Sequence, residues 1–113
     1  MIAGVKQPNN YKNAKVDLTT TDATALYTCP SATTATIKSI LVSEDSGSAD
    51  TITVTITDAD ADVFSLFKVK AIGANGTVEL LTQPLVLTED EIIKVTAATA
   101  NRLHVVASLL EIN

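Results

Sequence analysis

The chain has 113 residues, a formal net charge of −5, an apolar content of 46% and an aromatic content of only 4%. This length fits one domain with one hydrophobic core, and the core must consist mainly of aliphatic side chains. An acidic chain lacks the basic surface that binds phosphates, so we expect no nucleic-acid partner. Because Cys29 is the only cysteine, an intrachain disulfide and a cysteine-based zinc site within one chain are both excluded.

The first twenty residues differ in composition from the rest of the chain. They contain three lysines and one aspartate, whereas residues 21–113 contain five basic and twelve acidic side chains. Proline and asparagine in "QPNNYKN" oppose regular structure. We therefore predict an extended N-terminal arm over residues 1–20, and a disordered end is the alternative. The arm is expected to bind a partner surface through Ile2, Val5, Lys6, Tyr11, Lys12 and Lys15.

The arm is also expected to contribute little to the core, so that deletion of residues 1–18 leaves folding intact. The N-terminus has no continuous apolar segment of the signal-peptide type, and no stretch is long enough to cross a bilayer. We therefore expect synthesis and folding in a cytosol and no membrane partner.

From residue 23 onward the sequence follows the period of two that is typical of β-strands. In "TITVTIT", Ile52, Val54 and Ile56 fall on one face and the threonines on the other. Similar runs are separated by Gly, Pro and Asn clusters. These runs span residues 23–29, 34–44, 63–72, 76–82, 91–98 and 102–112. Their spacing predicts an all-β fold, an antiparallel β-sandwich or jelly-roll-like domain over residues 21–113.

Two of the predicted strands are apolar on both faces. A domain with one core has one inner face per sheet, so the second apolar face indicates contact with another subunit. The predicted subunit interface consists of Phe64, Leu66, Val106, Leu110 and Ile112. A central strand covered by loops is the alternative interpretation.

Three aspartates follow the threonine-rich strand at alternate positions. Asp58, Asp60 and Asp62 match the acidic positions at the start of a calcium-binding loop. The sixth position of that loop is Val63 instead of glycine, and the twelfth is Val69 instead of glutamate. We therefore predict an exposed strand end or turn and no metal site.

The remaining reactive side chains form no catalytic motif in the sequence. His104 is the only histidine, and the serines Ser39, Ser43, Ser65 and Ser108 have no other imidazole base. The acidic run of residues 89–91 fits a solvated turn. We expect neither an enzyme nor a cofactor.

The order of the segments resembles a group of small virion proteins from tailed bacteriophages. The resemblance rests on "ALYTCPSATTATIKSILVSEDSGSADTITVTITDAD" and "LTEDEIIKVTAATANRLHVVASLLEIN", over about residues 25 to 112. This chain departs from the pattern at Glu44-Asp45, where Asn is common, and at Asp90-Glu91, where Gly-Asp is common.

The resemblance implies a multimeric β-sandwich subunit of the virion. The expected protein is a homotrimeric capsid decoration, or cement, protein that binds the major capsid protein or another virion subunit. The alternative is a neck, tail or fibre-associated protein with a receptor- or glycan-binding role.

Overall fold

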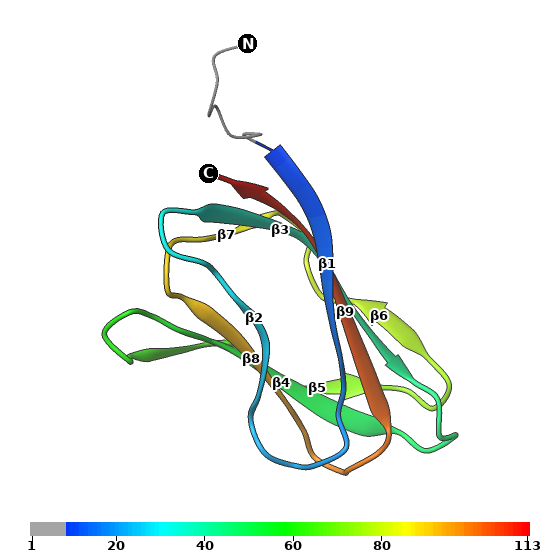
Figure 1. Cartoon of the computed structure of the whole chain (residues 1–113). Helices are drawn as coiled ribbons and strands as arrows, with labels where there is room; N and C mark the ends of the chain where they lie inside the picture. The colour runs from blue at the N-terminus through cyan, green and yellow to red at the C-terminus, as the bar shows by residue number, and fades with distance from the viewer. Residues whose placement is uncertain (1–8) are drawn as a thin grey trace.

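The computed structural model describes residues 9–113 as a β-sandwich of two antiparallel sheets, shown in Figure 1. Sheet A contains, in spatial order, β1 (Asn9–Asp17), β9 (Leu103–Ile112) and β3 (Thr34–Glu44), followed by β6 (Thr77–Glu79) and β7 (Leu85–Leu87), which both pair with the far edge of β3. Sheet B contains β2 (Thr24–Thr28), β8 (Ile92–Ala97), β4 (Asp50–Thr57) and β5 (Val63–Ile72). No membrane-spanning helix occurs in this part of the chain. The expected sandwich is confirmed.

The core lies between the sheets and is aliphatic, as the composition predicts. Alternate residues of each strand point inward, so Ile37 of β3 and Val105 of β9 face Ile52 and Val54 of β4 across the layer. All four side chains are fully buried. Burial of one such side chain is worth about 1.5–3 kcal/mol, so the two inner faces supply the main stabilisation.

The N-terminal segment differs from the predicted arm. Residues 9–17 form β1, which pairs with β9 without a register shift from Asn9↔Ile112 to Asp17↔His104. Ala14 and Val16 pack against the core, and Leu18 is fully buried just after the strand. An Asn-rich sequence can form this strand because it lies at an edge, where backbone pairing with β9 replaces burial of alternate side chains. The prediction of an arm outside the strands was therefore wrong for residues 9–17.

The other strands follow the sequence pattern more closely, but several contain β-bulges. The pairing of β5 with β4 shifts twice, and Val69 lies in the second irregular stretch with a φ of 54°. The pairing of β3 with β9 shifts between Ile37 and Ser39, so Ile37 and Ile40 both point inward. These bulges change which side chains face the solvent.

Candidate interaction surface

The outer face of sheet A carries two cross-strand rows that consist mainly of apolar side chains, with Thr36 in one and Lys15 in the other. The first row runs from Tyr11 through Leu110 and Thr36 to Val86. The second runs from Lys15 through Val106 to Leu41. Several of these apolar side chains are exposed: Tyr11 at 74%, Val86 at 56%, Leu41 at 41% and Val106 at 37%, with Ile112 at 42% near the end of β9. Clustered apolar exposure of this kind marks interaction sites.

This face brings together residues that the sequence assigned to two separate surfaces. Tyr11 and Lys15 were predicted in the arm, whereas Val106, Leu110 and Ile112 were predicted in the subunit interface. The register places Tyr11 opposite Leu110 and Lys15 opposite Val106, so these side chains share one face. Ile2, Val5 and Lys6 lie outside the residues that the structure describes. The sequence could not show this grouping because it depends on the pairing of the first strand with the last.

Lys12 points to the opposite side of β1. Its Nζ lies 3.4 Å from Oε1 of Glu111, whose side chain is nearly buried. The other carboxylate oxygen of Glu111 accepts a 2.5 Å hydrogen bond from the Tyr27 hydroxyl. Burial and the adjacent Glu111 carboxylate both raise the pKa of Tyr27, so the phenol stays protonated and donates. Lys12 therefore balances a buried charge and ties β1 to the sandwich, and it does not lie on the outer face of sheet A.

Phe64 and Leu66 do not join the outer face of sheet A either. Both belong to β5 of sheet B, where Phe64 is opposite Ile56 and is 56% exposed. Leu66 occupies the bulge between Phe67 and Ser65 and packs against the core. Ile56 also packs against the core, so its partner Phe64 lies on the same inner side of sheet B as Leu66. The structure therefore separates these two predicted interface residues from Val106, Leu110 and Ile112.

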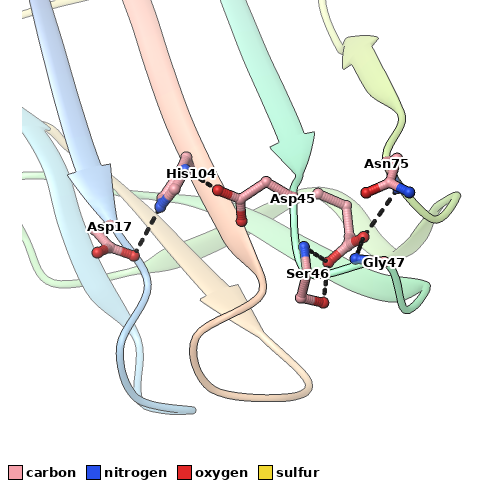
Figure 2. A network of polar contacts seen from close by, with 7 residues as sticks. Asp17, Asp45, Ser46, Gly47, Asn75 and His104 are labelled. Carbon is pink, nitrogen blue, oxygen red and sulfur yellow. Dashed lines mark hydrogen bonds and ion pairs between the residues drawn. The ribbon is translucent and has the colours of Figure 1, made fainter.

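A polar cluster surrounds the only histidine at one end of the outer face of sheet A. Figure 2 shows His104 of β9 between Asp17 of β1 and Asp45 of the β3–β4 turn. His104 Nε2 lies 3.2 Å from an Asp17 oxygen, and Nδ1 lies 3.5 Å from an Asp45 oxygen. Ser43 is opposite His104 in the register, which completes a Ser, His and Asp row. Both ring nitrogens are directed at carboxylates, so neither is directed at the Ser43 hydroxyl as nucleophile activation requires.

A second polar centre at this end of the molecule is the side chain of Glu44. Its carboxylate accepts hydrogen bonds from the backbone N–H groups of Ser46 (2.8 Å), Gly47 (3.1 Å) and Asn75 (3.0 Å), and from the Ser46 hydroxyl (Figure 2). Burial alone would raise the pKa of Glu44, but these donors hold it at about 2. Glu44 thus fixes the β3–β4 turn and the loop after β5 as an anion. In the sequence, Glu44 stands out only as a departure from the pattern of the virion proteins, and nothing in the pattern predicts this role.

The three aspartates form the β4–β5 turn, as the sequence predicts. Oδ1 of Asp58 accepts hydrogen bonds from the backbone N–H groups of Asp60 (3.0 Å) and Asp62 (2.9 Å). The Asp58 N–H donates to the Asp62 carbonyl at 2.9 Å, which closes the turn. One carboxylate oxygen from each aspartate lies within 4.8 Å of the others. The role that the structure assigns to Asp58 is therefore that of a turn-forming residue.

Open hollows on the described surface have volumes of about 230 to 350 Å³. One of about 230 Å³ is lined by residues of β1 and β9, among them Lys15, His104 and Val106. One of these volumes lies below the range of about 300–1,000 Å³ for small-molecule sites and the others lie near its lower end, and all are open to solvent. The apolar sheet face is therefore better suited to another macromolecular surface than to a small ligand.

No protein-family model matches the chain, and no curated protein sequence matches it. In fold, the chain is similar to a protein of Bacillus endospore appendages, described as a novel family of disulfide-linked pili. The TM-score is 0.58 at 8% sequence identity, and the match covers 100% of this chain and 95% of the other. At this identity the likeness shows a shared β-sandwich fold alone.

Proposed function

We propose that this protein is a structural subunit of a tailed-phage virion, and that it acts as a decoration protein that cements the head shell. The observation that carries the proposal is the outer face of sheet A, where apolar side chains from β1, β9, β3 and β7 line up across the sheet. The sequence resemblance to small virion proteins supports the choice of partner, which is the major capsid protein.

The proposed mechanism is binding without chemical turnover. An exposed apolar face gains free energy when it is removed from water, at about 25 cal/mol per Å² of apolar surface. If the protein binds only the assembled shell, it stabilises that state by RT ln(1 + [L]/Kd), which is about 2.7 kcal/mol at a hundredfold excess over Kd. Such a subunit would raise the temperature or force at which the shell opens.

The fold comparison supports assembly as one use of this architecture, because the neighbour forms pili. Disulfide linkage is not part of the proposal for this chain. Cys29 is fully buried, and its sulfur lies 3.3 Å from the Thr33 carbonyl oxygen and 3.7 Å from that of Leu87. Burial raises the pKa of the Cys29 thiol, which further lowers its reactivity.

The second candidate function is a neck, tail or fibre-associated protein that binds a receptor or glycan. Sugar-binding sites commonly stack sugars on exposed aromatic rings. Tyr11 and Phe64 are the exposed rings of the described residues, and they lie on different sheets. Tyr27 and Phe67 are packed against the core. This distribution favours the shell over the glycan.

The test is sedimentation of the purified protein with phage heads that lack it. The double variant Tyr11→Ser/Val106→Ser removes apolar contact from the outer face of sheet A and should weaken binding by at least about tenfold. The control is Val63→Ser, which removes an exposed apolar side chain from sheet B and leaves the outer face of sheet A unchanged. Equal loss in both variants, or no binding to heads by the wild type, would overturn the proposal. Binding to host cells or glycans in place of heads would favour the second candidate.

A further inference from the structure

We propose that strand β1 is a self-association edge: it pairs antiparallel with β1 of a second copy, about a two-fold axis at Asn13, and joins the two A sheets into one. The pairing of β1 with a second copy does not depend on which macromolecule binds the outer face of sheet A.

The first observation is the direction of the backbone groups of β1. The Leu18 N–H donates to the Leu103 carbonyl oxygen at 3.0 Å, so even-numbered positions direct their N–H groups toward β9. In an antiparallel strand the direction alternates from one residue to the next. The odd-numbered positions therefore direct their N–H and C=O groups to the open side of the edge. These residues are Asn9, Tyr11, Asn13, Lys15 and Asp17, and the C=O group of Asp17 already accepts a hydrogen bond from the Thr19 N–H at 3.0 Å.

The second observation is that β1 is long and regular, although it is an edge strand. It has nine residues, no proline and no register shift. The β5 edge contains two bulges, the β2 edge has five residues and one bulge, and β6 and β7 have three residues each. Bulges, short strands, proline and charged side chains are the devices that prevent edge-to-edge pairing, and β1 has only the last of these, in Lys12, Lys15 and Asp17. β1 is the one edge of the described sheets that combines length with regular pairing.

The third observation is that β1 is complementary to itself. With Asn13 on the axis, all nine residues overlap, and open-edge positions are paired with open-edge positions. Tyr11 is then opposite Lys15 of the second copy, which allows a cation–π contact, and Asp17 is opposite Asn9 of the second copy. The Asn13 side chains of the two copies can exchange amide hydrogen bonds.

Neighbouring registers either shorten the overlap or place like charges opposite each other. A shift of the axis by one residue to Ala14 limits the overlap to residues 11–17. A shift of the axis by one residue toward the N-terminus places Lys12 opposite Lys12 of the second copy. A shift by two residues toward the C-terminus places Lys15 opposite Lys15 of the second copy and shortens the overlap. Like charges directly opposite each other destabilise a strand pair. The register centred on Asn13 avoids both contacts and keeps the full length.

This pairing has a structural consequence for the outer face of sheet A. A two-fold axis between antiparallel strands is perpendicular to the sheet, so both outer faces point to the same side. The apolar row that starts at Tyr11 then continues into the second copy. The inferred contact is a dimer contact, which differs from the homotrimer that the sequence resemblance implies.

The test uses two variants with opposite charge at the axis, Asn13→Lys and Asn13→Asp. Each variant places like charges opposite each other and should raise the dimer dissociation constant by at least about tenfold in sedimentation equilibrium. An equimolar mixture, with one variant carrying a tag, should recover association as the heterodimer. Asn9→Lys is the matched control, because its new charge would lie opposite Asp17 of the second copy and should leave the dimer intact. The circular dichroism spectrum and melting curve of each variant establish that it is folded.

A wild-type protein that is monomeric at about 100 µM would overturn the inference. So would a trimer whose association none of the three substitutions changes, or an Asn13 pair that fails to form the heterodimer. A dimer that behaves as expected but does not bind phage heads supports this inference and overturns only the proposed function.

Discussion

β1 of sheet A and β5 of sheet B are the two long edge strands of the sandwich, and each has backbone groups on its outer side that no described strand of the same chain pairs with. Both are exposed along most of their length. β5 is broken by two bulges and carries Lys68 and Lys70, and the Val69 N–H in its second irregular stretch is bonded to the Thr53 hydroxyl at 3.1 Å. β1 pairs with β9 without a register shift and is rich in asparagine. Both edges carry lysines, so the feature that distinguishes β1 from β5 is its pairing without a register shift, and this regularity is what allows the inferred pairing with a second copy.

The attachment of the two strands to the core also differs. β5 reaches the core through Phe67 and the fully buried Ile72. β1 reaches it through Ala14, Val16 and the ion pair of Lys12, and the chain is then fixed by Leu18. A strand that is polar in sequence is therefore still part of the folded unit, because its backbone pairs fully with β9.

The largest expected effect on stability comes from deleting β1. Deletion of residues 1–18 removes β1, exposes the edge of β9, and leaves the Glu111 carboxylate without Lys12. The loss of Leu18 alone is worth about 2–5 kcal/mol, against a total stability of about 5–15 kcal/mol for a domain. We expect loss of cooperative folding in thermal melts followed by circular dichroism.

This expectation reverses the one drawn from the sequence, which treated the segment as a dispensable arm. The control is Tyr11→Ser, which changes the most exposed apolar side chain of β1 and should leave the melting temperature of the monomer within about a degree. A truncated protein that melts cooperatively at the wild-type temperature would show that β1 is not needed for the fold.

The next largest effect is expected at Glu44, whose carboxylate accepts hydrogen bonds from the β3–β4 turn and from the loop after β5. The pKa of Glu44 is lowered from its ordinary value of 4.5 to about 2 because the folded state donates hydrogen bonds to the anion. The contribution of this group is therefore fully present above about pH 4.5 and is lost as the pH falls toward 2. Glu44→Gln should lower the melting temperature at pH 7 and reduce its decline between pH 5 and pH 2. A decline as steep as that of the wild type would assign the acid sensitivity to other carboxylates.

The strands of this fold could largely be predicted from the sequence. The alternation in residues 34–44, 63–72 and 102–112 predicted the limits of β3 and β5 and, within one residue, those of β9. Burial of one face imposes a period of two, and this period is visible without any tertiary information. The short β7 was missed, because Leu85–Leu87 follows Pro84 and is too short to show alternation.

Other features could not be predicted because they depend on pairing between distant segments. β1 carries little apolar alternation, so its strand conformation is set by β9 and not by its own sequence. The pairing of β5 with β4 places Leu66, a residue expected at a subunit interface, in contact with the core. The union of Tyr11 with Val106 and Leu110 on one face follows from the same long-range register.

A smaller effect on stability is expected at Val69, in the second bulge of β5. Val69 is 59% exposed and adopts a φ of 54°, which is unfavourable for a β-branched residue. Val69→Gly should relieve about 1–3 kcal/mol of backbone strain, against a cost of about 0.5–1 kcal/mol for the flexibility of glycine in the unfolded chain, so the melting temperature should stay unchanged or rise. Val63→Gly, at an equally exposed position of β5 that has no positive φ, should instead lower stability by about 0.5–1 kcal/mol. Equal effects of the two substitutions would show that the bulge stores no strain.

The smallest expected effect is at the turn that joins β4 to β5. The carboxylates of Asp58, Asp60 and Asp62 lie within 4.8 Å of one another, yet Asp58 already accepts two backbone hydrogen bonds that shape the turn. We expect calcium and chelator to leave the melting temperature unchanged, whereas a bound ion would stabilise the fold by about 2.7 kcal/mol at a hundredfold excess over Kd. Asp60→Asn sharpens the test because this residue supplies only its backbone N–H to the turn. Without an ion the substitution removes repulsion between like charges and should raise the melting temperature slightly, both with calcium and with chelator. If an ion binds, the same substitution should lower the melting temperature when calcium is present but not when chelator is present. That result would make the β4–β5 turn a metal site.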